Sequence, residues 1–412
     1  MATPRKAAMG FIFVTLLIDT IGFGLIYPVL PRLIEQMIHG DLSQASRWNA
    51  WLMSAYAVTQ FICAPVIGSL SDKYGRRPVL LLSLFGFGLD YILLSLAPTI
   101  WWLVAGRVIA GITGASFTTA SAYIADISTA EDRAKNFGMI GAAFGLGFII
   151  GPAIGGLLGE LGPRVPFIVA ACLTLMNFIY GYFVLPESLS AENRRPFSWV
   201  RSNPLGSVLQ LKQYKGVGGL ILALVFVYIG GYAVQSTWAY VNIEKFNWGE
   251  GLIGISLTVV GVLVAGVQGG LIRFTNPRLG NEKSIYVGLG LYAAGLVLFA
   301  FANQGWMMFA FLVPYCLGGI AGPALQSVIT EHVPSNEQGE LQGTLTSLMS
   351  LTMIFGPMLM NNLFSWCTGK GAAIYFPGAP FLAGAIFMVI SIVIAAASMK
   401  KPSFINRGTG KA

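Results

Sequence analysis

Long apolar stretches alternate with short polar segments from one end of the chain to the other. A helix of about twenty apolar residues crosses the ~30 Å hydrocarbon core of a bilayer. The pattern therefore predicts an all-α polytopic membrane protein with twelve transmembrane helices. The expected spans are residues 8–31, 49–71, 78–97, 101–124, 136–159, 165–185, 216–241, 251–272, 284–302, 306–329, 341–366 and 376–398.

Composition and charge placement agree with this pattern. The 412 residues are 55% hydrophobic and 10% charged, whereas soluble domains carry about 25% charged residues. Most Lys and Arg fall between spans on one side of the membrane, so the positive-inside rule predicts that both termini are cytoplasmic. The net charge of +8 follows this placement and does not indicate nucleic-acid binding. No small-residue cleavage site follows the first apolar run, which predicts a retained first helix.

The chain divides near its midpoint. The longest polar stretch, 186–215, predicts a cytoplasmic linker between an N-terminal six-helix half (1–185) and a C-terminal six-helix half (216–412). A series of residues recurs in the second half at one constant spacing: Gly75 as Gly280, Gly114 as Gly319, Asp126 as Glu331, Asp132 as Glu337, Gly138 as Gly343, and Gly151-Pro152 as Gly356-Pro357. Two parallel six-helix repeats are typical of transporters, whose substrate site lies between the halves near the bilayer midplane.

Metal, redox and catalytic chemistry find little support in the sequence. Four Cys lie far apart without CxxC spacing, and His39 and His332 are the only histidines. We therefore expect no metal, no cofactor, no catalytic residues and no enzyme activity. A membrane sensor that transports nothing is the remaining alternative outside the transporter class.

Three charged residues, Asp19, Asp90 and Arg107, lie deep within predicted spans. Burying a charge in the membrane is costly, so such residues usually pair with one another or serve transport. One interpretation is a structural ion pair between Arg107 and either carboxylate. The other is that at least one carboxylate faces a wet cavity and exchanges a proton, because one Arg cannot neutralise two acids. The sequence leaves open which acid pairs with Arg107.

Four sequence motifs stand in order along the first half: LIDTIGFGLIYPVLP (17–31), GSLSDKYGRRP (68–78), RVIAGITGA (107–115) and GLGFIIGPAIGG (145–156). The second resembles the loop signature of the major facilitator superfamily, and the fourth resembles the signature of its proton-coupled drug antiporters. With SAYIADIS and FVLPES, the set is similar to the tetracycline efflux proteins, most densely over 11–188.

The resemblance implies a major facilitator fold and proton-coupled export of small amphipathic, tetracycline-like compounds by alternating access. It also implies a monomer in a bacterial inner membrane, with a small molecule, protons and lipid as its partners. Spans one and four line the cavity in this superfamily, so Asp19 is the first candidate for proton coupling, with Asp90 and Arg107. A runner-up function is a metabolite facilitator or importer without proton coupling.

The resemblance assigns roles to two further groups. Asp72 would meet a helix end of the other half, and the Arg residues would reach Asp126. The predicted cytoplasmic latch comprises Gly68, Asp72, Gly75, Arg76, Arg77 and Asp126. The predicted antiporter motif comprises Gly147, Gly151, Pro152, Gly155 and Gly156, whose small residues allow close helix contact.

Aromatic and amide side chains share helix faces in several spans, an arrangement that suits a flat amphipathic ligand. The predicted substrate-binding residues are Asp19, Tyr56, Gln60, Arg107, Tyr232, Gln235 and Gln326. The alternative is that the uncharged ones pack between helices or face lipid. The second half departs from the tetracycline exporters: Val264 stands where they carry a His, and span nine has no ionisable group except Tyr.

Overall fold

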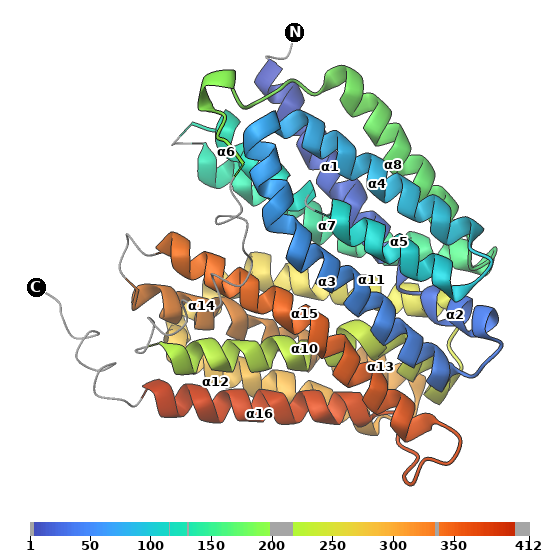
Figure 1. The fold of residues 1–412 in the computed structure, drawn as a ribbon. Helices are drawn as coiled ribbons and strands as arrows, with labels where there is room; N and C mark the ends of the chain where they lie inside the picture. Colours follow the sequence, from blue (N-terminus) through green and yellow to red (C-terminus); the bar gives the residue numbers. More distant parts are fainter. Residues whose placement is uncertain (1–3, 115, 130–131, 198–216, 334–337, 400–412) are drawn as a thin grey trace, which may run out of the picture. The chain divides into compact units, whose positions relative to one another are not determined.

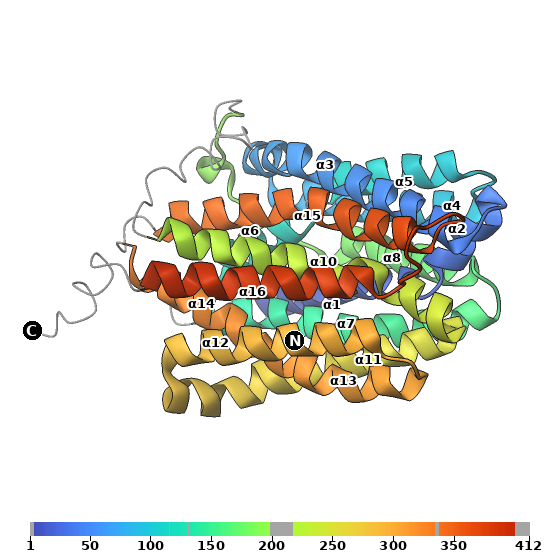
Figure 2. The same ribbon diagram turned by 90° about the horizontal axis from the view of Figure 1, so that it is seen from below.

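The computed structural model describes residues 4–114, 116–129, 132–197, 217–333 and 338–399. Over these ranges the regular secondary structure is helical, and twelve helical segments are long and apolar enough to cross a membrane. The predicted all-α, polytopic fold is confirmed, and each predicted span overlaps one of these segments. Figures 1 and 2 show the helices from two directions.

Helical elements cover almost all of the described chain. Those before the midpoint are α1 (Pro4–Ile26), α2 (Leu30–Ile38), α3 (Leu42–Tyr74), α4 (Arg76–Leu96), α5 (Ile100–Thr113), α6 (Ser116–Ile127), α7 (Arg133–Glu160), α8 (Val165–Val184) and the short η1 (Ala191–Asn193). Those after it are α10 (Gly218–Phe246), α11 (Glu250–Gly266), the π-helical η3 (Val267–Leu271), α12 (Ile272–Phe301), α13 (Gly305–Leu317), η4 (Gly318–Ile320), α14 (Ala321–Glu331), α15 (Gln338–Thr368) and α16 (Ala379–Met399).

The chain forms two compact units. Unit 1 contains Met1–Pro204 together with Trp248–Gly261, the first part of α11. In unit 1, α1 packs along α7 and α8, α3 along α5, and α4 along α5 and α8. Unit 2 contains Leu205–Asn247 and Val262–Ala412. In unit 2, α10 packs along α15 and α16, and α12 packs along α13, α14 and α16.

The first span is shorter than the apolar pattern predicted. The expected span 8–31 ends as helix α1 at Ile26, and a turn leads to the separate helix α2. Two prolines explain the break. Pro28 cannot donate the backbone hydrogen bond that would continue α1, whereas Pro31 lies in the first turn of α2, where that donor is not needed.

The repeat seen in the sequence has a counterpart in the backbone. In the fourth span α5 ends at Thr113, immediately before Gly114, and in the tenth span α13 gives way to η4, which contains Gly319. Gly75 and Gly280 both have positive φ, at 108° and 74°, a conformation that favours glycine. Thus equivalent positions of the two repeats break or turn the chain in the same way.

Apolar side chains fill the end of unit 1 near the start of α1. Phe11, Ile12, Leu16, Leu80 and Tyr123 are all buried in one cluster. Because the alternative environment of such a side chain in a bilayer is lipid, close van der Waals packing holds these helices together. The cluster packs α1 against α4 and α6. Asp19 lies one turn beyond Leu16 on α1, so the cluster also sets the position of Asp19 within unit 1.

Candidate functional site

The three deep charges come from three helices of unit 1. Asp19 on α1 is 9% exposed, and the side chains of Asp90 on α4 and Arg107 on α5 are 1% and 13% exposed. Arg107 Nη2 forms an ion pair with Asp90 Oδ2. The second oxygen of Asp90 packs against Gly106, where a Cβ atom would lie 2.5 Å from Oδ1. The structure therefore pairs Arg107 with Asp90, a choice that the sequence left open.

Aromatic side chains surround Asp19 and the ion pair. Tyr56 on α3 is buried within reach of the charges of Arg107, Asp19 and Asp90. Its ring packs edge-on against Phe23 of α1, with 5.8 Å between ring centroids. Two of the predicted substrate-binding residues, Tyr56 and Asp19, therefore lie in one polar cluster with the ion pair.

Two further residues complete this cluster. The Tyr91 hydroxyl touches α1 one turn beyond Asp19, since a Cβ atom at Gly22 would lie 2.2 Å from it. Gln60 of α3 donates from Nε2 to the carbonyl of Gly114 at the end of α5, at 3.3 Å. Sequence reasoning did not single out Tyr91, although it is adjacent to Asp90 and only the fold directs it toward α1.

Breaking the ion pair on one side is expected to destabilise unit 1 more than removing both charges. Arg107→Gln or Asp90→Asn alone leaves an unpaired buried charge, which costs about 3–5 kcal/mol. The double variant leaves two neutral groups and should recover much of that loss. Thermal unfolding in detergent measures the effect.

A matched control is the exposed pair Arg32–Glu35, whose side chains are 34% and 27% exposed. Arg32→Gln should cost less than about 1 kcal/mol, as expected for a surface pair. Equal losses for the single and double variants at Asp90 and Arg107 would contradict the paired arrangement.

The antiporter motif on α7 brings α7 and α1 into close contact. A Cβ atom at Gly147 would lie 2.5 Å from Thr20 Cβ, one at Gly151 2.8 Å from the Gly24 Cα, and one at Gly155 2.5 Å from the Leu25 carbonyl. Side chains at these positions would force the helices apart. These glycines thus position the stretch of α1 that carries Asp19.

The other motif residues contact two different helices. Pro152 Cδ would lie 2.7 Å from a Cβ atom at Gly24 of α1. Gly156 faces α11 instead, where an added Cβ atom would lie 2.6 Å from the Glu250 carbonyl and 3.0 Å from the Gly254 Cα. Thr258 Oγ1 donates to the Ile149 carbonyl at 3.1 Å in the same contact. The motif therefore serves two close packing surfaces.

The predicted latch residues gather around Arg76 at the start of α4. Arg76 Nη1 lies 2.6 Å from Asp72 Oδ1, and its Nε lies 3.2 Å from Asp126 Oδ2. Arg77 does not follow the expectation of reaching Asp126; its Nη2 donates to the Tyr182 carbonyl at 2.6 Å. At Gly68 an added Cβ atom would meet no described atom within 4 Å.

Unit 2 contains a counterpart of this cluster in which an amide replaces the guanidinium group. Asn281 occupies the position equivalent to Arg76 in the repeat, and its Nδ2 donates to Glu331 Oε1 at 3.1 Å. Ser327 Oγ donates to the same carboxylate oxygen at 2.8 Å. At the equivalent positions, unit 2 therefore has hydrogen bonds to a carboxylate where unit 1 has an ion pair.

Unit 2 contains three of the predicted substrate-binding residues, and each lies in a different environment. Tyr232 of α10 is buried against α15, because a Cβ atom at Gly356 would lie 2.2 Å from its ring. Gln326 of α14 forms a side-chain hydrogen bond with Tyr228, and Gln235 is exposed. The structure therefore joins Gln326 to α10 and gives Tyr232 a packing role within unit 2.

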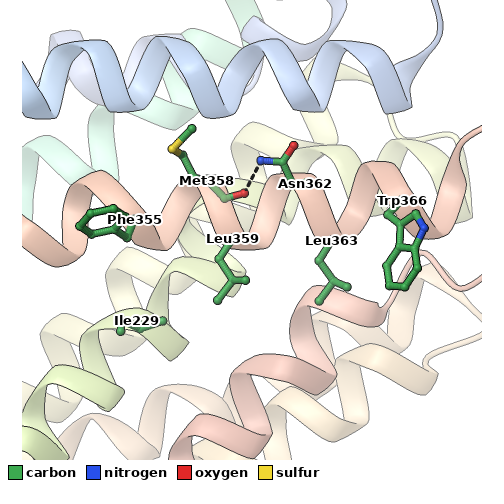
Figure 3. A pocket seen from close by; sticks show the side chains of 7 residues that line it. All are labelled: Ile229, Phe355, Met358, Leu359, Asn362, Leu363 and Trp366. Carbon is green, nitrogen blue, oxygen red and sulfur yellow. Dashed lines mark hydrogen bonds between the residues drawn. The ribbon is translucent and has the colours of Figure 1, made fainter.

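A groove of about 750 Å³ runs between α10 and α15 in unit 2. Figure 3 shows Phe355 at one end and Trp366 at the other, with Asn362 between them. Asn362 Nδ2 donates to the Met358 carbonyl at 2.7 Å, and the remaining lining is apolar: Ile229, Leu359 and Leu363. Such a groove can accommodate an apolar surface beside one amide.

Comparison with known proteins places the chain in a family. The model of the Major Facilitator Superfamily matches residues 12–357 and 220–409. The chain is 40% identical to the class C tetracycline resistance protein of Escherichia coli, over 89% of this chain and 94% of that protein. It is 37% identical to the class G protein of Vibrio anguillarum, over 92% and 94%.

Solved structures support the fold. A bacterial homologue of the human lysosomal transporter Spinster superposes with a TM-score of 0.75 at 14% identity, covering 99% of both chains. The sequence identities and the family model agree with this architecture. The chain belongs to the Major Facilitator Superfamily and, within it, to the family of the tetracycline resistance proteins.

Proposed function

We propose that this chain exports tetracycline-like amphipathic compounds across a bacterial inner membrane in exchange for protons. The observation that carries the proposal is the 40% identity to a tetracycline resistance protein over 89% of the chain. The buried carboxylate Asp19, whose charge acts on Tyr56 together with the charges of Asp90 and Arg107, supplies a group for proton exchange. Asp19 takes a proton from one side of the membrane and releases it to the other.

The coupling requires that proton and compound compete for the same state of unit 1. In this mechanism the ionised Asp19 favours the compound, and protonation releases it. The Asp90–Arg107 pair holds a counter-charge nearby, and Tyr56 offers an aromatic face to a flat ligand. Gln60 and Arg107 add hydrogen-bond donors from α3 and α5.

The N-terminal half (1–185), the linker (186–215) and the C-terminal half (216–412) act as two bundles and a connection, and transport proceeds by alternating access. Both termini are cytoplasmic, and the monomer is the working form. Gln326 and Gln235 are the amide side chains that unit 2 would offer to the compound, while Tyr232 packs α10 against α15.

Flux in proteoliposomes tests the function. Purified protein is reconstituted in vesicles with an imposed pH gradient, and tetracycline movement is followed by fluorescence. We expect movement against the tetracycline gradient that stops when an ionophore collapses the pH gradient.

Two results would contradict the proposal. Flux that equilibrates tetracycline or a metabolite and ignores the pH gradient would indicate a facilitator without proton coupling. Binding of tetracycline without any flux would indicate a sensor. Protein-free vesicles are the control for passive permeation.

A further inference from the structure

The segment that follows α8, residues 185–195, is called the strap here because it lies across the latch. Within it, Glu187 accepts four backbone hydrogen bonds. Its Oε1 accepts from Arg76 N at 2.8 Å, Ser188 N at 3.0 Å and Leu189 N at 3.0 Å, and its Oε2 accepts from Arg77 N at 3.2 Å. The carboxylate therefore caps the first turn of α4 from a position 111 residues further along the chain.

This cap compensates for an unfavourable charge arrangement at the start of α4. The helix begins with Arg76 and Arg77, two cations at the end where the helix dipole favours an anion. The residue before them, Gly75, has no side chain that could cap the helix. Glu187 supplies both the missing acceptors and the missing negative charge.

Gly75 of the latch motif is needed for this contact. Its φ of 108° lies in the region that favours glycine. A Cβ atom there would also lie 2.2 Å from Glu187 Oε2, so any other residue would displace the carboxylate. The glycine of the loop and the glutamate after α8 form one structural unit.

The strap also contacts the other two helices of the latch. Tyr123 Oη on α6 donates to the Pro186 carbonyl at 2.9 Å, and Arg195 N donates to the Asp72 carbonyl at the end of α3 at 3.0 Å. Ser188 Oγ donates to Asp126 Oδ2 at 3.0 Å, the same oxygen that binds Arg76 Nε. The strap thus joins the ends of α3 and α6 to the start of α4.

We propose that Glu187 is a positioning residue for transport: it fixes the first turn of α4 so that Arg76 holds Asp72 and Asp126 together. The inference rests on the proposed function, because the latch matters only if the protein alternates between states. Glu187 touches neither Asp19 nor the ion pair of Asp90 and Arg107 in the described contacts. Its loss should therefore lower the turnover rate and leave the substrate affinity unchanged.

Hydrogen exchange tests the positioning without any substrate. In Glu187→Ala the backbone amides of Arg76 and Arg77 should exchange about tenfold faster, the effect of losing a helix cap. Glu187→Gln keeps one acceptor oxygen and should give a smaller increase. Peptides that contain Asp72 and Asp126 should also exchange faster, as they should in Arg76→Gln. The control is Glu192→Gln, an exposed carboxylate in the same strap.

Transport kinetics supply the second measurement. In proteoliposomes loaded for tetracycline export, Glu187→Gln should lower kcat severalfold with KM unchanged, because Arg76 would less often hold Asp72 and Asp126 together. The double variant with Asp126→Asn should lose less than the product of the single effects, because both act through Arg76. Glu192→Gln should match the unmodified protein.

The outcomes separate this inference from the proposed function. If the unmodified protein does not move tetracycline, the proposed function fails, and the exchange data alone decide the positioning. Unchanged exchange at Asp72 and Asp126 would overturn the positioning role, since Glu187 would then cap α4 alone. Faster exchange with an unchanged kcat, or a raised KM, would overturn the link to transport.

Discussion

Replacing Asp19 by Asn is expected to abolish tetracycline movement driven by a pH gradient. The amide has nearly the same shape as the carboxylate, but it cannot bind and release a proton in the working range. Asp19 lies in the middle of α1 and is 9% exposed, so the substitution removes a charge whose burial is otherwise costly. Uphill flux in proteoliposomes should fall to the level of protein-free vesicles.

Two comparisons make this result specific. Asp132→Asn, which changes an exposed carboxylate before α7, should leave the flux unchanged. The Asp19→Asn protein should unfold at the same temperature as the unmodified protein or a higher one, since no buried charge remains at that position. Full gradient-dependent export by the Asn variant would remove Asp19 from the coupling mechanism.

Gly151→Val is expected to have the second large effect. The added Cβ atom would lie 2.8 Å from both the Gly24 Cα and the Ile21 carbonyl, and backbone atoms cannot rotate away as a side chain can. Overpacking of a filled site costs roughly 1–3 kcal/mol. The contact should open by displacing α1, which moves Asp19 relative to Asp90, so export should be lost with a lowered unfolding temperature.

The same helix offers a control for this substitution. At Gly141 an added Cβ atom meets no described atom within 4 Å, so Gly141→Val adds the same side chain to α7 without a clash. We expect this variant to keep its stability and most of its export. If both valine variants behaved alike, the helix propensity of valine would explain the effect, and the α1–α7 contact would not.

The charged residues illustrate what could be predicted and what could not. Asp19, Asp90 and Arg107 were visible as charges within apolar stretches, because hydropathy is a local property of the sequence. Their pairing was not visible, since α4 and α5 must first pack together before Arg107 can reach Asp90. The low accessibility of that carboxylate also depends on Gly106, which only the packed structure places beside it.

The latch also contains one contact that the sequence predicts and others that only the structure reveals. The loop motif with Gly75, Arg76 and Arg77 is recognisable in the sequence, and the family resemblance assigns Asp126 to it. Arg76 does reach Asp126, whereas Arg77 turns to the Tyr182 carbonyl. Glu187 received no role in the sequence reasoning, although its carboxylate binds the amides of both arginines.

The sequence by itself determined the twelve spans, the repeat and the identity of the motifs, because apolar length and residue spacing are read along one chain. The tertiary structure alone decided which groups meet. It paired Arg107 with Asp90 and packed Gly151 on Gly24. Each of these outcomes depends on distances between residues or on backbone geometry, which packing fixes to within an ångström and which hydropathy does not encode.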